Sequence, residues 1–273
     1  MVQDAVNILP FMKMHGLGND FVVFDERENG PMVTHALVIA MADRRCGVGY
    51  DQLVTIRDHP TEDIELIFWN ADGSVAGACG NATRCIAGWE LARLGEQSLT
   101  IRTERGVLHA ADAGNGEIEV NMGQPLLLWN EVPLASEMDT LILPIEGEPT
   151  ATGMGNPHCT FFVDDVDAVD LEAFGPKIEH HPLFPERTNV QIAQIIGPNQ
   201  IRMRVWERGV GITLASGSSS CAVAVAATRR GLIDGPATLT LDGGEIRIKI
   251  TDDGVLMTGK WAYVFDGQWR GIR

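Results

Sequence analysis

The sequence predicts an α+β fold of two pseudo-symmetric domains, each a curved, mostly antiparallel sheet wrapped around a central helix. One observation behind this is an internal repeat at an offset of 137 residues, the separation of Asn19 from Asn156 and of Cys79 from Ser216. The matches fall on amides and on an Ala-x-Gly turn rather than on common apolar residues, which argues against chance identity. A second observation is the segment 222–227, which is apolar on every side, as in a helix surrounded by protein. A chain of 273 residues is also long enough for two domains with a core each.

Short apolar segments bounded by turn residues predict the strands. In the first half we expect a helix over 82–94, ended by Gly95 as its C-terminal cap, and strands over 21–24, 53–56, 64–69, 99–103, 107–110 and 118–121. The second half repeats this order, with a helix over 218–230 and strands over 159–163, 190–195, 201–206, 237–241, 245–250 and 255–258. Asn115-Gly116 and Asp253-Gly254 predict hairpin turns.

These elements suggest where the domains begin and end. We expect a loose N-terminal extension over 1–10, with order beginning at Phe11. The first domain then covers 11–123 together with the returning segment 264–273, and the second covers 124–263. The turn-forming segment Gly123-Gln124-Pro125 marks the crossing between them.

Composition limits the partners and the compartment. Acidic residues outnumber basic ones by 37 to 21, for a net charge of −16, and no basic cluster stands out. Nucleic acid and membrane surfaces are therefore not expected partners, whereas a small zwitterion is compatible with this charge. No run of eighteen apolar residues and no signal peptide are seen, so we expect a cytoplasmic protein. The five cysteines suit a reducing compartment and have no metal-ligand spacing, so no metal is expected.

Two turns carry the chemistry. In each half a strand is followed by a Gly-containing turn and a helix, with Cys79 or Ser216 at the helix start. Helix N-termini bind anions and lower a thiol pKa from about 8.5 to roughly 3.5–7.5. Two such starts facing each other would clamp one carboxylate and leave a side chain on each face of the adjacent carbon, the geometry needed to invert an amino acid. Taken singly, Cys79 could instead be a small buried residue and Ser216 a helix N-cap.

No cofactor is expected. The segments Gly16-Leu17-Gly18 and Gly153-Met154-Gly155 are the nearest approach to a nucleotide-binding motif. Both lack the third glycine and the strand-to-helix context of a dinucleotide site.

Five motifs closely resemble those of the diaminopimelate epimerase family, over nearly the whole chain. They are Met14-His15-Gly16-Leu17-Gly18-Asn19-Asp20-Phe21, Asn70-Ala71-Asp72-Gly73-Ser74, Ala78-Cys79-Gly80-Asn81, Gly155-Asn156-Pro157-His158-Cys159 and Trp206-Glu207-Arg208-Gly209-Val210-Gly211. The resemblance implies that family's fold and a cofactor-independent, two-base epimerisation of LL-diaminopimelate to the meso form, in lysine and cell-wall precursor synthesis. The partners expected are this small substrate and, at most, a second copy of the chain in a homodimer.

The resemblance also assigns residues. Cys79 matches one catalytic thiol, with Ser216 at the position of the second. The backbone clamp on the reacting carboxylate matches Gly80, Asn81, Gly217 and Ser218. The positions that hold the amino groups and the distal carboxylate match Asn19, Gln52, Asn70, Asn156, Asn189, Glu207 and Arg208. These assignments agree with simple charge complementarity, because the Arg208 guanidinium can bind a carboxylate and the Glu207 carboxylate can bind an ammonium group.

One of these positions departs from the family. Its second motif normally reads Ala-Cys-Gly, whereas this chain has Ala215-Ser216-Gly217. A hydroxyl is a poor base, and loss of a positioned acid or base costs about 10²- to 10⁴-fold, so we expect a slow or one-sided enzyme on an intact binding site. The alternatives are a related racemase for proline-like or other amino acids, and a non-catalytic amino-acid-binding protein.

Overall fold

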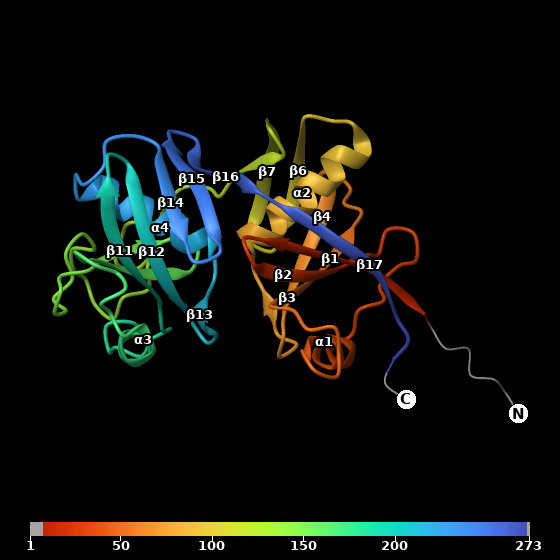
Figure 1. Cartoon of the computed structure of the whole chain (residues 1–273), viewed down its shortest axis with the longest axis horizontal. Coiled ribbons are helices and arrows are strands. Elements are labelled where there is room, and N and C mark those ends of the chain that lie inside the picture. Colours follow the sequence, from red (N-terminus) through yellow and green to blue (C-terminus); the bar gives the residue numbers. More distant parts are fainter. Residues whose placement is uncertain (1–7, 272–273) are drawn as a thin grey trace, which may run out of the picture. The chain divides into compact units, whose positions relative to one another are not determined.

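The computed structural model describes residues 8–271, which form two compact units. The first unit comprises 8–118 together with 261–271, and the second comprises Glu119–Lys260 (Figure 1). No helix among the described residues is long and apolar enough to cross a membrane.

The first unit is built on one curved sheet with the strand order β17-β1-β2-β3-β4-β6-β7, and the short β5 pairs with the end of β4. The β2–β3 and β4–β6 pairs are parallel and the others are antiparallel. The strands are β1 (Leu9–Gly16), β2 (Asn19–Asp25), β3 (Gln52–Arg57), β4 (Ile64–Asn70), β5 (Val75–Ala76), β6 (Ser98–Thr103), β7 (Gly106–Gly114) and β17 (Ala262–Trp269).

Helix α2 (Gly80–Leu94) is the centre of this unit. It contacts strands from both ends of the sheet, β17 and β1 at one end and β6 and β7 at the other, so the sheet curves around it (Figure 1). Every residue from Gly80 to Gly88 is buried. A Cβ at Gly88 would lie 2.3 Å from two atoms of the Trp261 indole, so the close approach of this ring requires glycine. Gly95 ends the helix in the left-handed conformation (φ 72°), as its position in the sequence predicts.

A second helix covers the outer face of the same sheet. Val38 and Met41 of α1 (His35–Ala42) are fully buried and belong to a cluster with Phe11, Val22 and Phe24. The sheet is therefore packed on both faces, and its strands contain long apolar runs rather than strict alternation.

The second unit repeats this plan with the strand order β9-β10-β11-β12-β14-β15-β16, while β13 pairs with the end of β12 and β8 pairs with β16. The strands are β8 (Glu117–Asn121, whose first two residues belong to the first unit), β9 (Thr150–Gly153), β10 (Pro157–Phe162), β11 (Asn189–Gly197), β12 (Gln200–Glu207), β13 (Gly211–Thr213), β14 (Ala237–Leu241), β15 (Gly244–Thr251) and β16 (Gly254–Lys260). Helix α4 (Gly217–Arg229) contacts β9, β10, β11, β15 and β16, and is buried throughout 219–227. Helix α3 (Leu171–Glu179) packs on β11, β12 and β13.

The expected α+β architecture is thus confirmed, with local corrections. Strand β1 begins at Leu9, two residues before the point where we expected order to begin, and 1–7 of the expected extension lie outside the described residues. The hairpin expected at Asp253-Gly254 is displaced by one residue: Thr251 pairs with Gly254, so Asp252 and Asp253 form the loop. At the other hairpin signal, Asn115 and Gly116 both have positive φ (55° and 73°), as a type I′ turn requires.

Candidate active site

Cys79 occupies the N-cap position of α2 in the first unit. Its backbone is extended (φ −144°), and its side chain makes no capping hydrogen bond to the first turn of the helix. The thiol is half-buried, whereas the thiols of Cys85, Cys159 and Cys221 are buried. Burial raises the pKa of Cys85 to about 12 and that of Cys159 well above its ordinary value, because the charged thiolate loses solvation. Cys79 therefore does not fit the interpretation as a small core residue.

Two amides lie next to this helix start. The Asn81 side chain donates from Nδ2 to Asn19 Oδ1 (3.1 Å), and Asn19 Nδ2 donates to Asp51 Oδ2 (2.7 Å). Arg84 Nη1 donates to Asn81 Oδ1 (3.0 Å), which fixes the orientation of that amide. A Cβ at Gly16 would lie 2.7 Å from Arg84 Nη2, so the glycine of the Met14–Phe21 motif makes room for the buried guanidinium.

A second amide pair joins two strands of the same unit. Gln52 and Asn70 are register partners on β3 and β4, and Gln52 Nε2 donates to Asn70 Oδ1 (3.0 Å). Asn70 Nδ2 donates to Ser74 Oγ (3.0 Å), and the Ser74 hydroxyl donates to Asp72 Oδ1 (2.6 Å). Both amides are half-buried, so they are held in place while remaining partly accessible.

A charged cluster supports the Asn19 side of the site. Asp20 accepts hydrogen bonds from Lys13 Nζ (2.6 Å) and Arg44 Nη2 (2.8 Å), and Arg44 also reaches Asp51 (2.8 Å). Burial raises the pKa of Asp20, but the hydrogen bonds from Arg44 and Lys13 outweigh it, so the pKa is lowered overall. Asp20 therefore stays ionised and anchors the turn that presents Asn19.

Ser216 occupies the equivalent N-cap position of α4 in the second unit. Its backbone is extended (φ −142°), and its side chain makes no capping hydrogen bond. Its hydroxyl instead donates to Glu207 Oε2 (2.9 Å), while Thr213 Oγ1 donates to Glu207 Oε1 (2.6 Å). The interpretation of Ser216 as a helix N-cap is thus right for its backbone and wrong for its side chain.

Asn189 and Arg208 form the next part of the second unit's site. Asn189 is buried, donates from Nδ2 to Pro157 O (2.9 Å) and accepts from the Arg208 backbone N–H (3.0 Å). The Arg208 guanidinium is tied to the Glu186 carbonyl through Nη1 (3.0 Å). The loop after β12 is therefore fixed to β11 at the point where Arg208 leaves the sheet.

Asn156 is oriented by a buried chain of polar groups. His158 Nε2 lies 2.8 Å from Asn156 Oδ1, and Gln191 Nε2 lies 2.9 Å from His158 Nδ1. Gln191 Nε2 also donates to Ser219 Oγ (3.1 Å) in the first turn of α4. The chain links the Gly155–Cys159 motif to the start of the helix that follows Ser216.

Within each unit, hydrogen bonds thus join several of the predicted site residues to one another. Hydrogen bonds join Asn19 to Asn81 and Gln52 to Asn70 in the first unit. In the second they join Ser216 to Glu207, and the Asn189 side chain to the Arg208 backbone. Sequence reasoning assigned no role to the supporting residues Asp20, Asp51, Asp72, Ser74, Arg84, His158, Gln191 and Thr213. Several of these residues lie inside the motifs quoted above, and that position was the sign in the sequence that they belong to the site.

Cys221 cannot substitute for the missing thiol. It lies in the body of α4 and has no exposed surface, so it does not reach the helix start. Among residues 8–271, no group of three or more His, Cys, Asp or Glu side chains is placed to hold a metal ion.

Comparisons with a family model and with related proteins identify the same family. The family model for diaminopimelate epimerase matches residues 11–128 and 150–264. The diaminopimelate epimerase of Rhodospirillum centenum is 49% identical over 265 residues, covering 94% of this chain and 91% of that protein. The diaminopimelate epimerase of Acidiphilium cryptum is also 49% identical, covering 95% of each chain.

Solved structures share the fold at low identity. A hydroxyproline epimerase from Agrobacterium vitis, with bound trans-4-hydroxy-L-proline, superposes with a TM-score of 0.70 at 13% identity, covering 96% of this chain and 91% of that one. A phenazine biosynthesis protein from Bacillus anthracis gives a TM-score of 0.70 at 14% identity, covering 96% and 99%.

Proposed function

Because the chain belongs to the diaminopimelate epimerase family, we propose that it interconverts LL- and meso-diaminopimelate by a two-base reaction that needs no cofactor. The observation that carries this proposal is the matched pair of helix starts. Each unit places a residue able to transfer a proton, Cys79 or Ser216, at an N-cap whose side chain does not cap the helix. We propose that the two residues stand on opposite faces of the same substrate carbon.

The substrate's reacting carboxylate would bind to the backbone N–H groups of the two helix starts. These groups belong to Gly80 and Asn81 in α2 and to Gly217 and Ser218 in α4. N–H groups in the first turn of a helix have no partner within the helix, and the helix dipole favours an anion there. Clamping the carboxylate stabilises the negative charge that develops when the α-proton leaves.

Cys79 would exchange a proton with one face of the α-carbon. As the thiolate it removes the α-proton and becomes the thiol, and in the reverse reaction the thiol returns a proton to the same face. The group on the opposite face supplies the second proton, so the substrate gains one proton for each that it loses. Its half-buried position at a helix start favours this role for Cys79.

Ser216 would act on the other face as a relay for Glu207. Its hydroxyl donates to Glu207 Oε2, so an α-proton can pass to Ser216 Oγ while the serine proton passes to the carboxylate. In the reverse direction a protonated Glu207 returns its proton through Ser216 to the carbanion. The group that changes charge is then the carboxylate and not the serine, which avoids an alkoxide.

The remaining amides and charged groups would hold the distal end of the substrate. The Arg208 guanidinium offers a planar fork for the distal carboxylate, and the Glu207 carboxylate offers a counter-charge for an ammonium. The amides of Asn19, Gln52, Asn70, Asn156 and Asn189 would orient these groups without adding net charge. We place the reaction in the cytoplasm, in keeping with five cysteines that form no disulfide.

Deuterium exchange tests the proposal. LL-diaminopimelate is incubated with the purified chain in D₂O, without added cofactor, and the α-protons are followed by NMR alongside the appearance of the meso isomer. We expect slow exchange and slow meso formation, and loss of both in Cys79→Ala. Tight binding without exchange of either stereoisomer would show an amino-acid-binding protein and refute the enzymatic role.

A further inference from the structure

A gap between diverging strands in the second unit is filled by a guanidinium. Strands β12 and β14 run parallel as far as the pair Arg202↔Thr240 and then separate. The Arg202 side chain closes this fork, because Nη1 donates to Met203 O (2.6 Å) and Thr240 O (3.3 Å). Its Nη2 donates to the carboxylate of Asp242. The hydrogen-bond acceptors of the fork are thus two backbone carbonyls and the Asp242 carboxylate, and the Asp167 carboxylate lies 4.0 Å from Nη2.

The first unit contains the same fork with a different residue at its base. The parallel pair Glu65↔Arg102 of β4 and β6 occupies the register position of Arg202↔Thr240, so Glu65 stands where the second unit has Arg202. Glu104, two residues beyond Arg102, corresponds to Asp242, two residues beyond Thr240. The acidic acceptor is therefore retained, while the resident cation is replaced by an anion.

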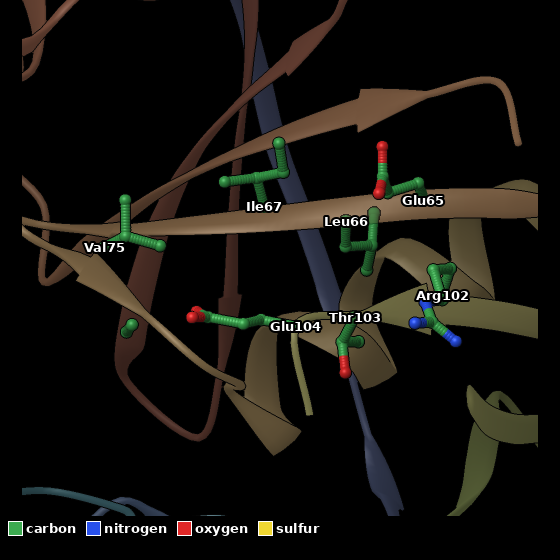
Figure 2. Close-up of a pocket in the computed structure, with 8 residues that line it drawn as sticks. Glu65, Leu66, Ile67, Val75, Arg102, Thr103 and Glu104 are labelled. Carbon is green, nitrogen blue, oxygen red and sulfur yellow. The ribbon is translucent and has the colours of Figure 1, made fainter. Parts of the chain in front are cut away.

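This fork is an open pocket of about 320 Å³. Its lining residues are Glu65, Leu66 and Ile67 of β4, Val75 and Ala76 of β5, and Arg102, Thr103 and Glu104 at and just after the end of β6. Figure 2 shows the Glu104 side chain reaching toward Val75, with the Arg102 guanidinium on the other side of the pocket. Arg102 therefore does not take the place that Arg202 fills in the second unit.

The pocket is suited to a planar cation. Among residues 8–271, neither Glu65 nor Glu104 forms an ion pair, so both carboxylates are available to a ligand. By register, the carbonyls of Leu66 and Arg102 correspond to those of Met203 and Thr240 that accept from Arg202. A guanidinium presents several N–H donors in one plane, which suits two carbonyls and a carboxylate together.

We propose that the β4–β6 fork is a binding site for a guanidinium-bearing small molecule of amino-acid size, such as free arginine. The volume lies at the lower end of the range of small-molecule pockets, about 300–1,000 Å³. The ligand would take the place in the first unit that the Arg202 side chain takes in the second. It would also contact Ala76, three residues before Cys79, although the site does not depend on the proposed epimerisation.

Titration of the full chain with L-arginine, followed by calorimetry, tests this site. L-citrulline is the matched ligand control because it has the same shape with a neutral urea group. We expect saturable binding of one arginine, at least about tenfold tighter than citrulline, because charge-assisted hydrogen bonds are roughly twice as strong as neutral ones. Equal affinity for the two ligands, or no saturable binding of arginine, would overturn the proposal.

Variants locate the site. Glu104→Gln should weaken arginine binding about tenfold or more, and Glu65→Arg should abolish it by filling the fork with the chain's own guanidinium. Glu96→Gln, which removes a charge from an exposed position outside the pocket, should leave the affinity unchanged. Saturating meso-diaminopimelate should not compete, since competition would place arginine in the proposed active site. Unchanged affinity in Glu65→Arg, with the variant folded by circular dichroism, would refute the site.

The second unit provides a reciprocal test that does not use the pocket itself. Arg202→Ala empties the equivalent fork and should lower the melting temperature. Low millimolar guanidinium chloride should then raise the melting temperature of Arg202→Ala and leave that of the parent unchanged. Failure to restore stability would remove the premise that such a fork selects a guanidinium.

Discussion

Replacing Ser216 by Cys is the most direct test of the two-base assignment. The backbone of Ser216 matches that of Cys79, with φ of −142° and −144° and the same place before the helix, so a thiol at 216 would have the same geometry as the thiol at 79. Ser216 is only 5% exposed, and a thiol is slightly larger than a hydroxyl, so the substitution fits with small adjustments. The change adds a base at a position already built for one.

The size of the effect follows from the present partner of Ser216. In the proposed relay of the parent, the proton passes on to Glu207, and a carboxylate is ordinarily a much weaker base than a thiolate, with reference pKa values of about 4.3 and 8.5. We expect Ser216→Cys to raise kcat by about 10²- to 10⁴-fold, or about 3–5 kcal/mol of transition-state stabilisation, with little change in KM.

A double-variant cycle distinguishes a proton relay from Ser216 to Glu207 from a gain in activity that comes only from the new thiol in Ser216→Cys. Under the proposed mechanism, Glu207→Gln in the parent removes both the final proton acceptor and a contact to the substrate, whereas in Ser216→Cys it removes only the contact. Glu207→Gln should therefore cost at least about tenfold more in kcat when residue 216 is Ser than when it is Cys. The assay is α-deuterium exchange on both stereoisomers, with Ser216→Ala as the control that lacks any transferable proton.

Two results would refute this reasoning. If Ser216→Cys gave no gain in epimerisation while binding diaminopimelate normally, residue 216 would not face the α-carbon. If Ser216→Ala were as active as the parent, the hydroxyl would transfer no proton and the relay would be wrong.

Three further predictions concern the binding site and the core. Arg208→Lys should raise KM for diaminopimelate about tenfold, with a smaller change in kcat, because a lysine cannot form the bidentate pair with the distal carboxylate. Steady-state kinetics measures both constants, and an unchanged KM would show that Arg208 does not bind the substrate. Gly88→Ala should lower the free energy of unfolding by about 1–3 kcal/mol in urea denaturation, because the new Cβ meets the Trp261 ring, and Trp261→Leu should recover part of the loss. Glu90→Gln should cost about 3 kcal/mol at neutral pH, because the carboxylate is 1% exposed and accepts from both Arg27 (2.7 Å) and Arg93 (2.6 Å).

The last of these has a defined dependence on pH. Burial raises the pKa of Glu90, but the hydrogen bonds from Arg93 and Arg27 outweigh it and lower the pKa overall. Since the folded pKa is lowered, the stabilisation is present above the unfolded pKa of about 4.3 and is lost as the pH falls through the folded value. Melting temperatures measured between about pH 7 and 3 should therefore fall less steeply in Glu90→Gln than in the parent. Parallel curves would show that Glu90 is not ionised in the fold.

The sequence predicted the elements of the fold better than their packing. Strands such as 64–69 and helix α2 could be placed because apolar runs, Gly95 and the Asn-Gly turn are local signals. Helix α1 was not predicted, since its apolar residues do not follow a single stripe and resemble a strand in composition. A return of 264–273 to the first domain was expected, but the pairing of β17 with β1 was not, because it joins residues about 250 positions apart and leaves no local trace in one sequence.

For the proposed site, the sequence predicted which residues contact the substrate but not which neighbours hold them. The amides of Asn19, Gln52 and Asn70 were predicted as substrate contacts, and the structure adds that each is fixed by a neighbour. Such neighbours come from other strands or turns, so their spacing in the chain carries no pattern. The hydrogen bond from Ser216 to Glu207 was equally beyond sequence reasoning, because β12 and the start of α4 meet only in the fold.

The two units share a backbone plan and differ where the side chains carry charge or chemistry. Cys79 in the first unit corresponds to Ser216 in the second, and Glu65 corresponds to Arg202, while the strand pairing at the fork and the geometry of the helix start are the same in both units. Backbone hydrogen bonds and buried apolar groups fix the register, so a side chain at a helix start or in a strand fork can change without loss of the fold. In the fork, the second unit places the Arg202 guanidinium, hydrogen-bonded to Met203 O, Thr240 O and Asp242, whereas the first unit has an open pocket lined by Glu65, Arg102 and Glu104. The same freedom accounts for the change at 216, where a hydroxyl bonded to Glu207 occupies the place of a thiol and the helix start keeps its geometry.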